Sequence, residues 1–236
     1  YLLFLENAFP YMDNYNYHKG MKGIIQELKV LLKTKSIGTN SDRALLLDFQ
    51  ATLEIKPEKA IKLEKDALAQ IENITADNAR LVSNLHANLG GLYRMNGHPD
   101  LAREHMEKSI SLLDQFNLLH INDSIPQIAN YAMFLTEQQE PERGISELQK
   151  LSGIIKEYHS DDCLDYAKVQ ETLGTIYLMT ANLPQAKTHF KRAFKIYEKI
   201  WADEPEMIEA KYQEIQELYP QIGFCIGKNL SGLLTK

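Results

Sequence analysis

The chain has 236 residues, of which 44% are hydrophobic and 25% are charged, a composition typical of a folded soluble protein and not of a disordered one. The formal net charge of -6 argues against nucleic acid as the partner, because nucleic-acid binding depends on a basic surface. No apolar run approaches the roughly 18 residues that a membrane-spanning helix needs, so we expect no membrane partner.

Two cysteines, Cys163 and Cys225, show neither a CxxC spacing nor a pattern shared with histidines. We therefore expect reduced thiols and a cytoplasmic location. The chain begins with Tyr1 and not with methionine, which indicates a processed chain or a piece of a longer protein.

The first 40 residues predict a degenerate N-terminal unit, residues 1–40. Leu5 and Phe9 fall in the registers that later repeats fill with apolar residues, and residues 20–33 have the spacing of a helix. A turn comes next, in which Ser41 is the expected N-cap of the next helix.

From residue 41 onward the sequence repeats with a period of 42 residues. One register is large and apolar (Leu47, Leu89, Tyr131 and Leu173), and the next is small in three of four copies (Asp48, Gly90, Ala132 and Gly174). One helical turn after the first register come Ala51, Tyr93, Leu135 and Tyr177. A fourth register is small throughout (Ala60, Ala102, Gly144 and Ala186). Small residues at two of these registers would let two antiparallel helices approach closely. The repeats predicted from this period are 41–82, 83–124, 125–166 and 167–208.

Each repeat is predicted to be a helix, a short turn and a second helix. Pro57, Pro99 and Pro141 share a register, and proline is well placed in the first turn of a helix. Apolar positions continue the second helix, which we expect to run in the first repeat from Pro57 to Ile74. Such a hairpin does not bury its apolar faces alone, so neighbouring hairpins must stack.

A further helix is predicted to begin at Pro205, with Ile215 and Tyr219 in register. Pro220 interrupts it, and three glycines weaken the last stretch of the chain (Gly223, Gly227 and Gly232). Residues 209–236 are therefore predicted to form a partial or capping unit.

These motifs resemble the tetratricopeptide repeat. Leu89-Gly90 with Tyr93 and Leu173-Gly174 with Tyr177 match that family's pattern, although its usual period is 34 residues. The longer period is similar to the kinesin-light-chain subtype, as are Asn88, Asn130 and residues 194–200. The resemblance covers about residues 41–219. It implies an all-α fold, a right-handed α-solenoid (superhelix) of antiparallel helix hairpins.

In an array of this kind the first helices line a concave groove that binds a protein or peptide partner. Spacings of three and four residues from the buried row place polar side chains there, and the predicted partner-binding residues are Asn84, Asn88, Arg94, Asn130, Lys168, Glu171 and Thr172. Asn88 and Asn130 have an alternative role, hydrogen bonding that stabilises the stack of helices, and plain exposure is a third.

The groove of the first repeat is apolar (Leu45, Leu46, Phe49 and Leu53). It is either covered by the N-terminal segment, which we favour, or open as an apolar pocket.

Catalytic and metal sites are not predicted, and neither is a cofactor. His86, His98 and His105 cluster near one hairpin without an HExxH pattern, so we interpret them as surface or helix-packing residues. Asp161-Asp162 is interpreted as N-capping charge for the next helix, and Trp201 as a packing residue near the last repeats.

The sequence thus predicts a non-enzymatic protein–protein interaction module. The alternative is a regulatory or sensor region of a larger multidomain protein, such as a signalling ATPase or a transcription regulator. Self-association through an end of the array is a further expectation, and an enzyme acting on small molecules is the least favoured class.

Overall fold

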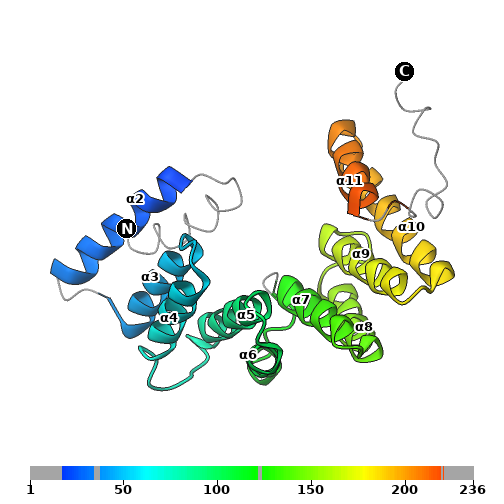
Figure 1. Ribbon diagram of the computed structural model, residues 1–236. Helices are drawn as coiled ribbons and strands as arrows, with labels where there is room; N and C mark the ends of the chain where they lie inside the picture. Colours follow the sequence, from blue (N-terminus) through cyan, green and yellow to red (C-terminus); the bar gives the residue numbers. More distant parts are fainter. Residues whose placement is uncertain (1–17, 35–37, 122–123, 219, 221–236) are drawn as a thin grey trace. The chain divides into compact units, whose positions relative to one another are not determined.

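The computed structural model describes residues 18–34, 38–121, 124–218 and 220, and those residues contain helices and no strand (Figure 1). The helices are α2 (His18–Thr34), α3 (Asn40–Thr52), α4 (Pro57–Leu68), α5 (Ala79–Met95), α6 (Pro99–Gln115), α7 (Ser124–Glu137), α8 (Pro141–Tyr158), α9 (Leu164–Met179), α10 (Leu183–Ile200) and α11 (Pro205–Leu218). The expectations for Leu5, Phe9, Tyr219, Cys225 and the three C-terminal glycines concern residues outside the described ranges.

The helices form two compact units that divide between Leu118 and Leu119. The first unit contains α2, a first hairpin of α3 and α4, and a second hairpin of α5 and α6. The other unit contains a third hairpin of α7 and α8, a fourth hairpin of α9 and α10, and then α11. The predicted all-α class of stacked helix hairpins is confirmed.

Close approach of the two helices within a hairpin depends on the small residues that the sequence repeats. A Cβ atom added to Gly90 would lie 2.5 Å from Cγ of Met106, and one added to Gly174 would lie 2.9 Å from the Phe190 ring. In the third hairpin the neighbour is backbone and not a side chain, because a Cβ on Gly144 would lie 2.7 Å from the backbone oxygen of Ala132. Helix α8 therefore packs directly against the backbone of α7.

We expect Gly144→Ala to destabilise the protein by about 2 kcal/mol, because the added methyl group meets backbone that does not move independently. Gly153→Ala in the same helix is the matched control, since a Cβ there meets nothing within 4 Å. This control should stabilise the protein by up to about 1 kcal/mol through helix propensity. Urea unfolding of both variants checks the prediction, and equal effects would contradict the close approach at Gly144.

The turns inside the second, third and fourth hairpins have the same backbone geometry. Gly97, Gln139 and Ala181 come after the first helix at intervals of 42 residues, and all have positive φ angles, of 76°, 64° and 58°. In each turn this residue and the next donate backbone hydrogen bonds to the last turn of the helix, as in the Schellman motif. The sequence did not predict this register, because it holds three different residue types.

The residue types in this register predict opposite effects of matched substitutions. Ala181→Gly should stabilise the fourth hairpin by about 0.5–1 kcal/mol, because glycine adopts a positive φ without steric cost. Gly97→Ala should destabilise the second hairpin by about 1 kcal/mol for the same reason. No atom lies within 4 Å of a Cβ at Gly97, so packing does not confound that test. Denaturant unfolding measures both changes, and shifts of the same sign would refute the assignment.

Two predicted helix boundaries in the first hairpin are wrong. Helix α4 ends at Leu68 and does not reach Ile74, which is 40% exposed. The Asn78 side chain forms a turn instead, accepting from the Thr75 N–H at 2.8 Å and donating to the Asn73 oxygen at 2.9 Å. Short polar side chains compete in this way with helical backbone hydrogen bonds.

The N-cap of α3 is Thr39 and not Ser41. The Thr39 hydroxyl accepts from the Asp42 N–H at 3.2 Å, and the Asp42 carboxylate accepts from the Thr39 N–H. This reciprocal capping box starts the helix at Asn40, so Ser41 lies inside the first helical turn.

Helix α2 covers the apolar face of the first hairpin, as the favoured interpretation predicted. One apolar stripe of this helix is buried with Phe49, and Leu45, Leu46 and Leu53 pack against the same cluster; the stripe is Met21, Ile24, Ile25 and Leu28. The spacing of three and four residues along α2 gives a continuous stripe that matches α3. The predicted N-terminal helix therefore shields this face, in which Phe49 is buried and the three leucines are half-buried.

Candidate partner-binding face

Helices α7 and α9 pack as neighbouring first helices in the third and fourth hairpins. Their buried rows include Tyr131 and Leu173, while a second row of residues, spaced three and four positions apart along each helix, remains exposed or half-buried. We call this surface the α7/α9 face; its residues are Asn130, Met133, Lys168, Thr172, Thr175 and Met179. It holds three of the residues predicted to bind a partner.

The polar groups of the α7/α9 face remain largely accessible. The Lys168 side chain is 55% exposed, and its Nζ lies 3.9 Å from the Asp165 carboxylate, so the ion pair is weak. The Thr172 hydroxyl donates to the Lys168 backbone oxygen at 3.0 Å, while Asn130 is exposed. An amide and an ammonium group therefore remain accessible to a partner.

Glu171, also predicted to contact a partner, is engaged within the chain. Its side chain is 19% exposed, and its Oε1 lies 3.0 Å from Nζ of Lys211 in α11. The other carboxylate oxygen accepts from the Tyr197 hydroxyl at 2.6 Å. Burial and the Glu171 charge raise the pKa of Tyr197, so its hydroxyl keeps the proton that it donates. Glu171 thereby links α9 to α10 and α11.

The remaining predicted residues, Asn84, Asn88 and Arg94, lie on α5 in the first unit. Asn84 and Arg94 are half-buried. The Asn88 amide nitrogen donates to Oδ1 of Asp48 at 2.9 Å and to Oε1 of Glu64 at 3.3 Å. These bonds tie α5 to α3 and α4, which supports the alternative role of Asn88 in stabilising the stack.

The acidic pair under Asn88 occupies a register that is apolar elsewhere. The equivalent pairs in the next three hairpins are Gly90 with Met106, Ala132 with Leu148, and Gly174 with Phe190. Glu64 is only 2% exposed, and its Oε2 has no hydrogen-bond partner among the described residues. Asp48 is the one residue of its register that is not small. This departure is the signal in the sequence that points to the acidic pair.

Glu64 is expected to be protonated at neutral pH. Burial of the carboxyl group is the main cause that raises its pKa, and the charge of Asp48 and a hydrogen bond to it raise the pKa further. The hydrogen bond from Asn88 acts in the opposite direction but is a smaller effect. The buried Glu64 and the half-buried Asp48 thus share one site between the first two hairpins.

We expect this pair to make the free energy of unfolding fall as the pH rises. The folded chain retains the Glu64 proton, whereas the unfolded chain releases it above a pH of about 4.3, so alkaline conditions favour unfolding. Glu64→Gln should reduce this loss by at least about 1 kcal/mol between pH 5 and pH 8. Urea unfolding at several pH values measures it, with Glu58→Gln on the exposed surface of α4 as the control. Parallel pH profiles for wild type and Glu64→Gln would show that the pair is ionised.

Two histidines join the helices of the second hairpin. His86 Nδ1 lies 2.9 Å from His105 Nδ1, and the Tyr93 ring stacks on His105 with 5.4 Å between centroids. Burial lowers the pKa of His86 to about 4, with a smaller effect from His105, so the pair remains neutral near pH 7. The fourth hairpin repeats this arrangement 84 residues later, with Gln170, His189 and Tyr177. The interpretation of His86 and His105 as helix-packing residues is supported.

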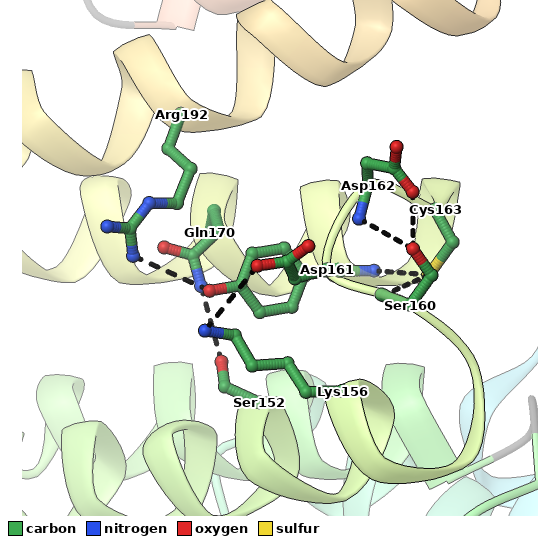
Figure 2. A network of polar contacts seen from close by, with 9 residues as sticks. Ser152, Lys156, Ser160, Asp161, Asp162, Cys163, Gln170 and Arg192 are labelled. Carbon is green, nitrogen blue, oxygen red and sulfur yellow. Dashed lines mark hydrogen bonds and ion pairs between the residues drawn. The ribbon is translucent and has the colours of Figure 1, made fainter.

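The loop between α8 and α9 corrects another prediction. Neither Asp161 nor Asp162 caps α9, because the helix begins at Leu164 and the N-cap is Cys163 (Figure 2). The Cys163 Sγ accepts from the Tyr166 N–H at 3.5 Å and donates to the Ser160 oxygen at 3.2 Å. The two aspartates lie outside the helix, where they pair with lysines.

Trp201, the C-cap of α10, stacks on Tyr197 with ring centroids 4.9 Å apart, as expected of a packing residue. In the part of the chain that the structure describes, no three metal-binding side chains cluster together. No helix in that part has the length and apolar character that crossing a membrane requires.

Residues 124–199, which contain the third and fourth hairpins, match the family model of the tetratricopeptide repeat. The third and fourth hairpins are therefore similar to tetratricopeptide repeats. The match covers α7 to α10, and the solved structures extend the likeness in fold over most of the chain. A search of the curated proteins finds no match.

Several solved structures are similar to this chain in fold. BtubC (BKLC) from P. vanneervenii is 17% identical, with a TM-score of 0.57 over 84% of this chain and 72% of that one. Two structures of putative kinesin light chain nearly identical TPR-like repeats from Podosopora anserina, one of them a point variant, are 13% and 12% identical. Their TM-scores are 0.65 and 0.61, and the alignments cover 84% and 85% of this chain and 96% and 98% of theirs. The predicted likeness to kinesin-light-chain-type repeats is confirmed.

Proposed function

We propose that the chain is a non-enzymatic protein–protein interaction module that binds an extended peptide segment of a partner on the α7/α9 face. Tetratricopeptide repeats are generally protein-interaction modules, and residues 124–199 match that family. The observation that carries the proposal is the accessible row of amide, ammonium, hydroxyl and thioether groups on two neighbouring first helices.

The chemistry of this row suits an extended backbone with an acidic side chain. The Asn130 amide donates and accepts at once, so it pairs with a peptide N–H and C=O. The exposed Lys168 ammonium attracts a carboxylate. Met133 on α7 and Met179 on α9 supply adaptable apolar contacts. These groups bind a partner without any reacting centre.

The predicted partner-binding residues divide into two roles in this proposal. Asn130, Lys168 and Thr172 contact the peptide on the α7/α9 face, whereas Asn84 and Arg94 lie on α5 in the first unit and remain predicted partner-binding residues of that unit. Asn88 and Glu171 act indirectly, because their polar atoms already bind Asp48, Glu64, Lys211 and Tyr197. They position the helices that present the contacting groups.

The experiment begins with peptides selected from a random display library against the purified chain. Binding of the selected peptides should weaken about tenfold in the double variant Asn130→Ala/Lys168→Ala, which corresponds to about 1.4 kcal/mol. The control is Lys187→Ala, which removes an exposed lysine from the second helix of the fourth hairpin. Titration by fluorescence anisotropy gives each dissociation constant.

A photo-crosslinking amino acid locates the bound peptide independently of affinity. Placed at Thr175, it should label the peptide, whereas the same group at the exposed Lys191 of α10 should not. Equal binding by wild type and the double variant, together with crosslinking only from Lys191, would refute the assignment of the α7/α9 face.

A further inference from the structure

A polar pocket of about 460 Å³ lies in the second unit, away from the residues of the α7/α9 face. The end of α8, the loop before α9, the start of α9 and the second half of α10 line it (Figure 2). Four basic and two acidic side chains face this space: Lys156, Arg192, Lys195, Lys199, Asp161 and Asp162. The formal charge of these six groups is therefore +2.

The two acidic groups each have a basic partner. Asp161 lies 3.8 Å from Nζ of Lys156, and Asp162 forms an ion pair with Lys199. The Lys199 and Ser160 hydrogen bonds lower the pKa of Asp162, so it remains charged. Arg192 and Lys195 have no acidic partner among the described residues, and the excess positive charge of the pocket lies on them.

Tyr166 positions two of the cations. This residue is 2% exposed, and its hydroxyl accepts from Arg192 Nη1 at 3.5 Å. The Lys156 ammonium lies 5.2 Å from the centroid of the same ring. A buried ring therefore holds one wall of the pocket, and less side-chain entropy is lost when a ligand binds.

The basic cluster is not a requirement of the repeat. The residues equivalent to Arg192, Lys195 and Lys199 are Lys150, Gly153 and Glu157 in α8, and Lys108, Ser111 and Gln115 in α6. The other hairpins fold with the same helix packing but without three basic residues here. The cluster therefore reflects a property of this pocket and not of the fold.

We propose that this pocket binds a phosphate monoester. Such a group carries a charge of about -1.5 to -2 at pH 7, which matches the two cations without acidic partners. The planar guanidinium of Arg192 offers paired N–H donors that fit two phosphate oxygens, and Lys195 contributes a point charge. A carboxylate ligand carries a smaller charge and has fewer acceptor oxygens, so the pocket favours phosphate over carboxylate.

The test is calorimetric titration of the purified chain at low ionic strength with inorganic phosphate, O-phosphoserine and a short peptide with a central phosphoserine. Matched probes are serine and the same peptide with glutamate. Arg192→Gln/Lys195→Gln should weaken phosphate-ester binding about tenfold or more. Lys187→Gln/Lys191→Gln is the control, because it removes the same charge from exposed positions of the same helix, and it should change affinity by less than about twofold.

A variant that gains affinity for phosphate esters tests the pocket even if Arg192→Gln/Lys195→Gln folds poorly. Asp161→Asn/Asp162→Asn releases Lys156 and Lys199 from their acidic partners and should strengthen phosphate-ester binding several-fold. Asp203→Asn/Glu204→Gln makes the same change in net charge at exposed positions and should have little effect. These measurements are independent of the α7/α9 face, so they leave the peptide-binding proposal untouched.

The probes also identify the source of the phosphate group. Tighter binding of the phosphopeptide than of O-phosphoserine indicates a phosphorylated partner protein, and equal binding indicates a small phosphorylated molecule. Both results support the pocket. No measurable binding of any phosphate probe, or equal losses in the pocket and control variants, would overturn the proposal.

Discussion

The close approach of two antiparallel helices at a small residue is the constraint on which the second, third and fourth hairpins depend. In the third hairpin the backbone of α7 at Ala132 leaves no room for a side chain at Gly144. In the second and fourth hairpins a large side chain, Met106 or Phe190, fills the space over a glycine. Since the helices pack at these contacts, the residues on the opposite side of the first helices remain available for other uses.

The first hairpin replaces that apolar contact with a carboxylic acid pair. Asp48 and Glu64 occupy the registers of the small and large residues, and the Asn88 amide of the next hairpin closes the site. Burial raises the pKa of Glu64, and the hydrogen bonds from Asn88 hold α5 against α3 and α4. Asn88, which the sequence predicted to contact a partner, thus forms hydrogen bonds within the stack of helices.

Two helices outside the regular hairpins determine which surfaces remain accessible. Helix α2 covers the apolar face of the first hairpin, and α11 contributes Lys211 to the Glu171 carboxylate while its Tyr212 stacks on Phe194. On the α7/α9 face, by contrast, the Asn130 amide and the Lys168 ammonium group remain accessible. The polar pocket near Arg192 draws most of its charge from the second helices, so the two proposed sites use different surfaces of the repeat.

The amino-acid sequence by itself determined the helices, the hairpins and their close contacts. The repeat period, the positions of the prolines and the small residues are local or strictly repeated features. They determine the helices and their packing through backbone geometry and contacts between adjacent helices. Only the tertiary structure decided the roles of individual polar groups. Glu171 reaches Lys211 from 40 positions away, Asn88 reaches Asp48 from the same distance, and Lys156 and Arg192 meet around Tyr166. Such pairs depend on which side chains the stacked helices bring together. The turn register that holds Gly97, Gln139 and Ala181 also has no signal in the sequence, because three different residue types share one backbone conformation.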